Sequence, residues 1–377
     1  MKYKKITLSL LILGICISSF IYLQRWTRTN KVIKIGVVGT MSGINSDLSV
    51  LGRRGVELAV DEFNEAGGLD GRKIELVVKD DQNDSTTALK VDKEFISENI
   101  PVVIGHYTSG MMVNSMEYLK DKDILFLSPT ISADSLLGID DNFIRFIATT
   151  REQAIILADT AHKNNQKQFA VIYNLENAGF NDAFYNNFKR LLEKDNGQVI
   201  LTKTYTSSVD VNYSSLAEDI AGAQAEAVLL IASAVDNALI TQQLRKIGNK
   251  TQIYAPLWSN TEDLWIKGGA AVEGMFIVGA IDINGKATDL VKFKEKYFDK
   301  YGENLTFSAV YSYEATTSLF QAMKMGPDLK PSTIKHNLIS IKDFKGLDGN
   351  YQINKFGDNM RKYMMLKIED GQLRRVD

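Results

Sequence analysis

The chain has 377 residues, of which 45% are hydrophobic and 24% charged, so it can bury the cores of two domains. Residues 1–31 hold six basic side chains and no acidic one, which leaves 38 Lys and Arg against 46 Asp and Glu in the remainder. This acidic remainder argues against nucleic acid as a partner. The single cysteine, Cys16, cannot form an intramolecular disulfide, and three scattered histidines give no metal-site pattern. We therefore expect neither a metal nor a cofactor.

The N-terminal 31 residues predict a membrane segment. Three lysines precede an uncharged run, residues 6–23, which as a helix would span about 27 Å, near the lower limit for crossing a bilayer. An uncleaved anchor, a cleavable signal peptide and a lipoprotein signal at Cys16 are all compatible with this run. The anchor is favoured, because no small-residue cleavage site stands out and Ile15 is large for the position before a modified cysteine. Each alternative places residues 32–377 outside the cytoplasm.

From residue 32 onward, short β-branched runs alternate with amphipathic helical windows at the spacing of βαβ units. A first series predicts strands at 33–38, 73–79, 101–104, 124–127 and 143–146, with helices at 51–65, 85–98 and 111–120. A second series predicts helices at 151–164, 181–195, 213–222 and 236–247, with strands at 169–173, 199–204, 227–231, 252–255 and 275–278. Helices at 288–301, 309–325 and 332–339 follow, and strands at 350–353 and 363–368 end the pattern. This alternation predicts an α/β fold.

Three of the expected strands run directly into loops rich in Gly, Ser and Thr: IKIGVVGTMSG from Ile33, VVIGHYTSG from Val102 and LFLSPTISAD from Leu125. In an open parallel sheet, ligands bind just beyond the carboxyl ends of the strands. Loops of this kind that lead into helices present hydroxyls and backbone N–H groups to an anionic group. The sequence therefore predicts a binding site for a small polar molecule.

Motifs of common enzyme classes do not occur in the chain. Gly36, Gly39 and Gly43 lack the G-x-G-x-x-G spacing, and there is no P-loop, nucleophile elbow or zinc-protease motif. The adjacent carboxylates at 80–81 and 140–141 would point to opposite faces of a strand, so they form no acid–base pair. We do not expect an enzyme.

Three longer segments accompany these loops along the chain. They are GVELAVDEFNEAGGLDGRKIELVVKDDQND from Gly55, FKEKYFDKYGENLTFSAVYSYEA from Phe293 and GLDGNYQINKFGD from Gly346. Over about residues 32–375, the chain resembles the type I periplasmic binding proteins, above all the leucine/isoleucine/valine-binding receptors of ABC transporters. The resemblance implies two Rossmann-like lobes, joined by a three-crossing hinge, that trap a ligand between them. It assigns residues 32–149 and 280–357 to lobe 1 and residues 150–279 and 358–377 to lobe 2.

The same resemblance implies how lobe 1 holds a ligand. In the branch that binds amino acids, the loop matching Tyr107 to Gly110 binds the α-carboxylate through a hydroxyl and N–H groups, and Ser109 stands in that loop. The loop that contains Ile131 and Ser132 supplies a carbonyl and a second hydroxyl. Both serines stand before helical windows, so helix capping is their alternative role.

Departures from the family pattern concern mainly the other side of the cleft. An aromatic residue of lobe 1 is replaced by Leu51, and a tyrosine of lobe 2 falls at Ala178. The acidic residue that pairs with an ammonium group falls at Leu257. The expected lobe 2 contacts are an apolar wall with a few polar groups: Phe180, Leu257 and Trp258, with Asn177, Ser233 and Asp236. Helix capping is the alternative role of Asp236, and packing within the lobe is that of Trp258.

These features predict an extracytoplasmic solute-binding protein that traps an amino-acid-like or carboxylate-bearing ligand for an ABC importer. Its expected partners are the ligand, the permease subunits and the membrane. The missing acid at Leu257 favours a ligand with a carboxylate or amide head and an apolar or aromatic tail over leucine or valine. The alternative function is a membrane-anchored sensing module that acts on a signalling partner. His106 is expected to be a structural histidine without a ligand role.

Overall fold

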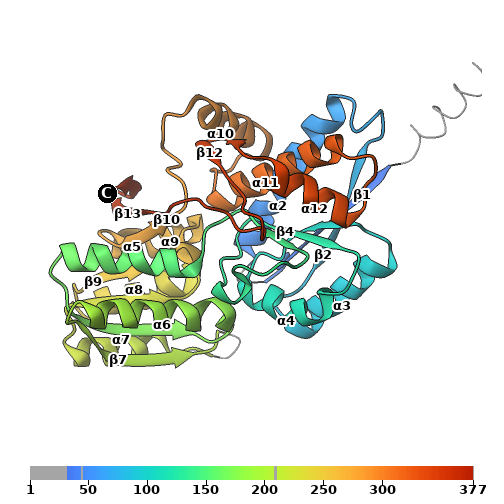
Figure 1. The fold of residues 1–377 in the computed structure, drawn as a ribbon. Coiled ribbons are helices and arrows are strands. Elements are labelled where there is room, and N and C mark those ends of the chain that lie inside the picture. The colour runs from blue at the N-terminus through green and yellow to red at the C-terminus, as the bar shows by residue number, and fades with distance from the viewer. Residues whose placement is uncertain (1–31, 44–45, 208–209, 377) are drawn as a thin grey trace, which may run out of the picture.

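The computed structural model describes residues 32–43, 46–207 and 210–376. The predicted membrane segment, residues 6–23, lies outside these ranges. In the part of the chain that is described, no helix is both long and apolar enough to cross a bilayer. Two α/β lobes lie side by side, each built around its own sheet (Figure 1). The predicted α/β fold with two lobes is confirmed.

The first lobe is built on a parallel sheet with the strand order β2-β1-β3-β4-β5. Its strands are β1 (Ile33–Gly39), β2 (Ile74–Asp80), β3 (Val102–Ile104), β4 (Leu125–Ser128) and β5 (Phe143–Arg145). Side chains alternate along a strand, so the neighbouring residues Val37 and Val38 of β1 point to opposite faces of the sheet, and both are buried. Val37 packs toward helices α2 (Asp47–Glu65), α11 (Phe307–Met325) and α12 (Pro331–Ser340). Val38 packs toward α3 (Ser85–Ser97) and α4 (Ser109–Leu119).

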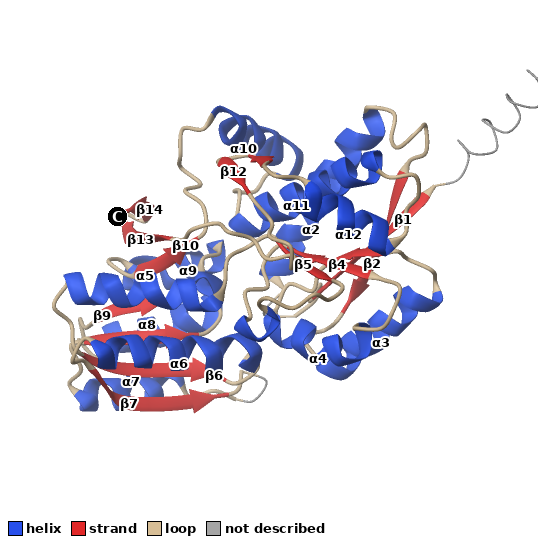
Figure 2. Cartoon of the chain, in the orientation of Figure 1, coloured by secondary structure: helices blue, strands red, loops and turns tan. Residues whose placement is uncertain are grey.

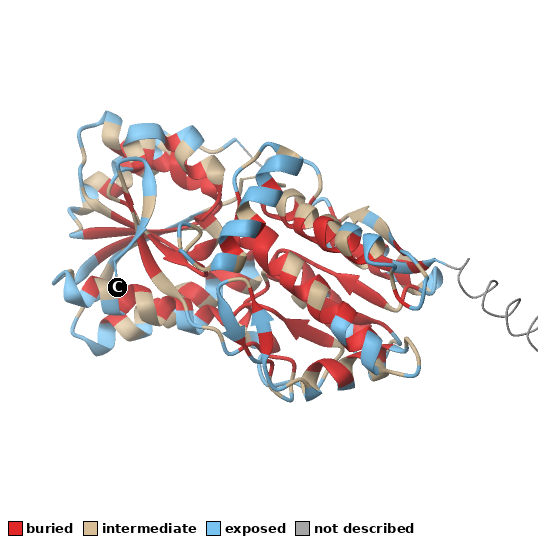
Figure 3. Ribbon diagram, turned by 90° about the horizontal axis from the view of Figure 1, so that it is seen from above, coloured by how far each residue is buried: buried red, intermediate tan, exposed pale blue. Residues whose placement is uncertain are grey.

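The second lobe is built on a larger, mixed sheet with the strand order β14-β13-β10-β9-β8-β6-β7. Strands β6 (Gln168–Asn174), β7 (Gln198–Tyr205), β8 (Ala227–Ile231), β9 (Gln252–Ala255) and β10 (Phe276–Gly279) are parallel. The hairpin of β13 (Met364–Glu369) and β14 (Gln372–Arg375) adds antiparallel strands at one edge. The central strands β6, β8, β9 and β10 are mostly buried between helices whose outer faces are exposed, whereas the edge strands β7 and β14 contain no buried residue (Figure 3).

Alternation along β6 again assigns helices to the two faces of the sheet. Phe169 packs toward α5 (Thr150–Lys163) and α6 (Ala178–Lys194). Ala170 packs toward α7 (Tyr213–Ala223), α8 (Ala234–Lys246) and α9 (Glu262–Gly268). Figure 2 shows these helices on both sides of the red strands. The remaining α-helix is α10 (Thr288–Tyr301), and β11 (Phe344–Gly346) and β12 (Gly349–Tyr351) form a short hairpin. Short 3-10 helices lie at Asp134–Leu136, Leu257–Ser259 and Gly269–Val272.

Three segments connect the lobes, after β5, after β10 and after β12, within the described residues. Buried polar contacts tie these segments to one another. The Tyr363 hydroxyl donates to the carbonyl of Ala148 at 2.7 Å, which joins the third segment to the first. The Tyr311 hydroxyl donates to the carbonyl of Ala280 at 2.6 Å, and the Arg361 guanidinium lies 4.3 Å from the Tyr311 ring. The three connections therefore form one hinge, while the predicted lobe limits within it stay a prediction.

The observed elements differ from the predicted ones mainly where helices begin at the cleft. Helices α2, α4 and α6 begin at 47, 109 and 178, each earlier than the 51, 111 and 181 expected from periodicity. The first turns of α4 and α6 contain Gly110 and Gly179, and glycine is a poor helix former that carries no hydrophobic signal. The short elements α9, β11 and β14 were not expected. Residues that face the cleft were therefore the hardest to place from sequence.

A buried charge cluster supports the first lobe beneath the Tyr107–Gly110 loop. The fully buried His106 lies between two buried carboxylates, with Nδ1 2.8 Å from Asp81 and Nε2 3.2 Å from Asp92. The hydroxyl of Thr40 donates to the other oxygen of Asp81 at 2.9 Å. Burial opposes the charged imidazole, but the two carboxylates outweigh it and raise the pKa of His106 to about 10. His106 thus has a structural role here, as predicted.

This cluster predicts a pH-dependent stability. The folded protein keeps the His106 proton up to a pKa of about 10, whereas an unfolded histidine loses it near pH 6.5. The stabilisation is therefore complete below pH 6.5 and is lost as pH rises toward 10. We expect the free energy of unfolding to fall between pH 6.5 and 9, by at most about 1.4 kcal/mol per pH unit. Urea denaturation at a series of pH values measures this slope.

The matched variants are His106→Gln and, as a control, His162→Gln, because His162 is exposed. His106→Gln should unfold at lower urea and lose the slope between pH 6.5 and 9. His162→Gln should keep the wild-type slope. An unchanged slope in His106→Gln would contradict the assignment of the charge to this histidine.

Candidate functional site

A small cavity lies between the lobes, where the first turns of α2, α4 and α6 meet. Its volume is about 20 Å³, which is room for about one water molecule. Seven residues predicted to contact a ligand line it: Tyr107, Ser109, Ser132, Asn177, Phe180, Leu257 and Trp258. Four lining residues were not predicted: Leu48, Thr130, Gln153 and Phe307. The structure thus brings most of the predicted site residues from both lobes to one place, while their ligand roles stay a prediction.

The first-lobe side of the cavity presents hydroxyls and a helix start. Ser109 is the first residue of α4, and Thr108 occupies the cap position that sequence reasoning gave to the serine as an alternative. Within the described residues, the Ser109 hydroxyl makes no hydrogen bond, so it is free for a ligand. The hydroxyl of Thr130 donates to the carbonyl of Tyr107 at 2.6 Å and ties the two ligand loops together. This side therefore resembles the anion-binding surface expected at a helix N-terminus.

Gln153 was not predicted from the sequence, yet its side chain makes several hydrogen bonds at the cavity. Its amide nitrogen donates to the hydroxyl of Ser132 at 3.3 Å, and its amide oxygen accepts from the N–H of Leu257 at 3.1 Å. The same amide nitrogen lies 3.3 Å from the hydroxyl of Tyr363 in the hinge. Gln153 therefore connects a ligand loop, the second-lobe wall and the hinge. No motif marks it, because it lies within the first turns of an ordinary amphipathic helix, α5.

The second-lobe side of the cavity is mainly aromatic and aliphatic. The rings of Phe180 and Trp258 lie edge to face with centroids 6.4 Å apart, and Leu257 lies next to the tryptophan. Leu48 and Phe307 add apolar surface from the first lobe. Among the described residues that line this cavity, none carries a charged side chain. The cavity therefore combines neutral hydrogen-bonding groups on one side with an apolar wall on the other.

Two polar residues predicted for the second-lobe wall lie elsewhere. The Ser233 hydroxyl caps α8 by accepting from the N–H of Asp236 at 3.2 Å. The Asp236 carboxylate accepts from the hydroxyls of Ser207 at 2.6 Å and Tyr213 at 2.7 Å, inside the second lobe. Neither residue lines the cavity, because capping and internal hydrogen bonds already satisfy their polar groups.

Three further predicted contacts also lie outside the cavity lining. Leu51 falls one turn too far along α2, and Leu48 takes its place because the helix begins earlier than expected. Ile131, whose loop was predicted to supply a backbone carbonyl, is not among the residues that line the cavity, and its side chain is buried in the first-lobe core. Gly110 does not line the cavity, but its N–H donates to the Asn177 side chain across the lobes at 3.0 Å.

The lobes touch directly on either side of the cavity. Asp47 at the start of α2 hydrogen-bonds the hydroxyl of Thr261 in the second lobe. Burial raises the pKa of Asp47, although this hydrogen bond partly offsets the rise. On another side, the Asn187 amide donates to Asp134 at 2.7 Å. The cleft is therefore closed in this structure.

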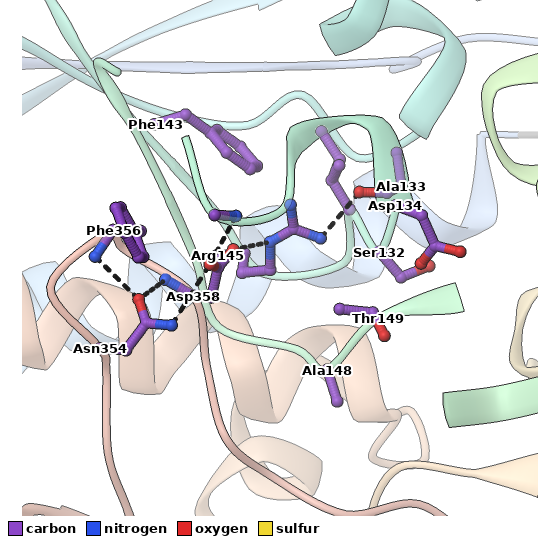
Figure 4. A network of polar contacts seen from close by, with 12 residues as sticks. Ser132, Ala133, Asp134, Phe143, Arg145, Ala148, Thr149, Asn354, Phe356 and Asp358 are labelled. Carbon is purple, nitrogen blue, oxygen red and sulfur yellow. Dashed lines mark hydrogen bonds and ion pairs between the residues drawn. The ribbon is translucent and has the colours of Figure 1, made fainter. Parts of the chain in front are cut away.

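The buried Arg145 connects the Ser132 loop to the hinge (Figure 4). Its guanidinium donates to the carbonyl of Ala133 at 3.0 Å, and its Nε lies 3.0 Å from the carboxylate of Asp358. The N–H of Thr150 donates to the carbonyl of Ser132 at 2.8 Å from the start of α5. Any movement of the hinge therefore acts directly on the loop that presents Ser132.

Comparisons with known proteins agree with this architecture. The family model described as periplasmic binding protein matches residues 32–372. The Leu/Ile/Val-binding protein homolog 3 of Brucella melitensis is 25% identical over 267 residues, which are 69% of this chain and 71% of the relative.

Two solved structures share the fold at low sequence identity. A leucine binding protein from Thermotoga maritima has a TM-score of 0.84 at 22% identity and covers 92% of this chain and 98% of its own. An ABC transporter solute binding protein from R. palustris, in complex with benzoate, has a TM-score of 0.84 at 20% identity. That alignment covers 92% of this chain and 96% of the neighbour.

We expect that removing the Arg145 side chain lowers the free energy of unfolding strongly. Arg145→Met would leave the buried Asp358 carboxylate without its cation, and breaking a buried pair costs about 3–5 kcal/mol. Chemical denaturation of Arg145→Met, with Arg151→Met at an exposed arginine as the control, measures this loss. The double variant Arg145→Met/Asp358→Asn should recover part of it, because no uncompensated charge remains. A stability of Arg145→Met within about 0.5 kcal/mol of the wild type would show that the pair contributes little.

Proposed function

The chain belongs to the periplasmic binding protein family, and on this premise we propose that it is the receptor of an ABC importer. In this proposal it captures a carboxylate-bearing organic molecule between its lobes and presents it to permease subunits. The lobes open and close by hinge rotation, in the way of two-lobed binding proteins. Family membership itself implies a binding protein rather than an enzyme and an extracytoplasmic location.

The observation that carries this proposal is the chemistry of the cavity between the lobes. The free Ser109 hydroxyl lies at the start of α4, where the helix dipole favours a negative charge. The Ser132 hydroxyl lies in the neighbouring loop, 3.0 Å from the Thr150 hydroxyl, and in this proposal it turns from Thr150 to donate to the same head group. A carboxylate is the anion that suits two such donors.

The same cavity disfavours an ordinary amino acid. The ammonium group of an amino acid loses its water when it enters a closed cleft, and it then needs an anionic or strong neutral acceptor. Leu257 stands where the family acid would pair with that group, and the described lining residues include no carboxylate. Asp236, which could have served as a replacement, is held by hydroxyl donors inside the second lobe.

The wall across the cavity supports an apolar or aromatic tail. Phe180, Leu257 and Trp258 present apolar surface there, and aromatic rings gain from edge-to-face contacts with an aromatic ligand. The two solved structures named above are a leucine binding protein and a benzoate complex, so this fold serves both ligand classes. We place this protein with the aromatic or apolar acids on the basis of its own side chains.

Membrane attachment through residues 6–23 remains part of this proposal, with secretion after signal cleavage as the alternative. The other function that the sequence left open, a sensing module acting on a signalling partner, gains no support from the relatives described above.

Isothermal titration calorimetry with benzoate, 4-hydroxybenzoate, leucine and isoleucine tests the ligand class. We expect an aromatic acid to bind at least tenfold more tightly than either amino acid. Ser109→Ala should weaken binding of that acid by roughly 10- to 150-fold, because a hydrogen bond to a charged group contributes about 1.5–3 kcal/mol.

The control is Ser85→Ala, since Ser85 is likewise the first residue of a first-lobe helix, α3, but is exposed. This variant should bind like the wild type. Tight leucine binding without binding of the acids would refute the ligand class, and equal affinities of Ser109→Ala and wild type would refute the placement of the head group.

A further inference from the structure

The Asn177 side chain forms a hydrogen bond to the opposite lobe instead of capping its own helix. It occupies the N-cap position of α6, where an asparagine side chain normally accepts from an N–H of its own helix. Its side chain makes no such capping bond here. Instead, the side-chain oxygen accepts from the N–H of Gly110 in the opposite lobe at 3.0 Å. The residue is nearly fully buried, with 5% of its surface exposed.

This hydrogen bond lies where two helix starts face each other. Gly179, in the first turn of α6, lies against the first turn of α4, and a Cβ built on it would lie only 3.3 Å from the Gly110 nitrogen. Both helix N-termini carry partial positive charge, so an acceptor between them is favourable. The neutral amide oxygen of Asn177 supplies that acceptor in this structure. A carboxylate would supply a stronger one.

The cavity beside Asn177 leaves no room for a second head group. The cavity of about 20 Å³ is lined by Asn177 and Ser109 together, and it holds no more than about one water molecule. A carboxylate cannot reach the Gly110 N–H while the Asn177 side chain occupies it. The amide group therefore stands in the place that the proposed ligand's head group needs.

We propose that Asn177 is a built-in surrogate for the ligand head group, which holds the lobes closed and is displaced when an acid binds. This inference rests on the proposed function for the ligand, but the closing role of Asn177 does not. A hydrogen bond of this kind shifts an open–closed equilibrium by roughly 2- to 10-fold. The apparent affinity of the protein for the acid is lower than the intrinsic one, because only the molecules that have released the Asn177–Gly110 hydrogen bond can bind the head group.

Three variants separate the possibilities: Asn177→Ala removes the acceptor, Asn177→Asp replaces it with a charged one, and Asn186→Asp is the control. Asn186 lies on the exposed face of the same helix, so Asn186→Asp adds the same charge away from the cleft. Small-angle X-ray scattering without ligand reports lobe opening. We expect a larger radius of gyration for Asn177→Ala, and wild-type values for Asn177→Asp and Asn186→Asp.

Calorimetry with benzoate at pH 7 gives the second measurement. Asn177→Ala should bind benzoate roughly 2- to 10-fold more tightly than the wild type, because the competitor is gone. Asn177→Asp should bind it at least tenfold more weakly, because a carboxylate already occupies the Gly110 N–H and repels a second one. Asn186→Asp should match the wild type.

The inference is overturned if Asn177→Ala keeps the wild-type radius of gyration. It is also overturned if this variant binds benzoate no more tightly than the wild type, because Asn177 would then not compete with the ligand. If the wild type binds none of the tested acids, the proposed ligand class fails instead. The scattering comparison still decides in that case whether Asn177 holds the lobes closed.

Discussion

The position of the cavity depends on buried polar contacts that tie the three connections between the lobes together. Arg145 pairs with Asp358 and donates to Ala133, so the Ser132 loop and the third connection share one buried cation. Tyr363 joins the third connection to the first through the carbonyl of Ala148. Buried charges and hydroxyls are costly without partners, so these segments have few alternative arrangements. The hinge therefore fixes which residues of the two lobes face each other.

Electrostatics then determine what the facing surfaces can hold. Helices α4 and α6 begin at the cleft and direct partial positive charge toward it from opposite sides. In the first lobe, the carboxylates of Asp81 and Asp92 lie beneath the Tyr107–Gly110 loop and are occupied by the two ring nitrogens of His106. In the second lobe, Asp236 is occupied by its own hydroxyl donors. The cleft is thus left with donors and apolar surface, which suits an anionic head group and an apolar tail.

Much of this arrangement could be predicted from sequence. Hydrophobic periodicity placed most of the strands and helices, and the loops after β3 and β4 indicated the ligand site because both are rich in hydroxyl residues. Periodicity carries little information in short, small-residue turns, so the true starts of α4 and α6 were missed. Leu51 was predicted in place of Leu48 for the same reason, since α2 also begins earlier than its apolar pattern. Gln153 and the Asn177–Gly110 contact join residues far apart in sequence, which no local pattern reveals.

If the head group of a bound acid takes the Gly110 N–H, the amide signal of this glycine must respond to the acid. Labelling with 15N-glycine gives one amide signal for each glycine, and Gly110→Ala identifies the signal of this residue, since a Cβ there meets no atom closer than 3.5 Å. We expect benzoate to shift the Gly110 signal more than the other glycine signals, with the dissociation constant that calorimetry gives. A Gly110 signal that stays in place while bound benzoate moves other glycine signals would show that the head group binds elsewhere.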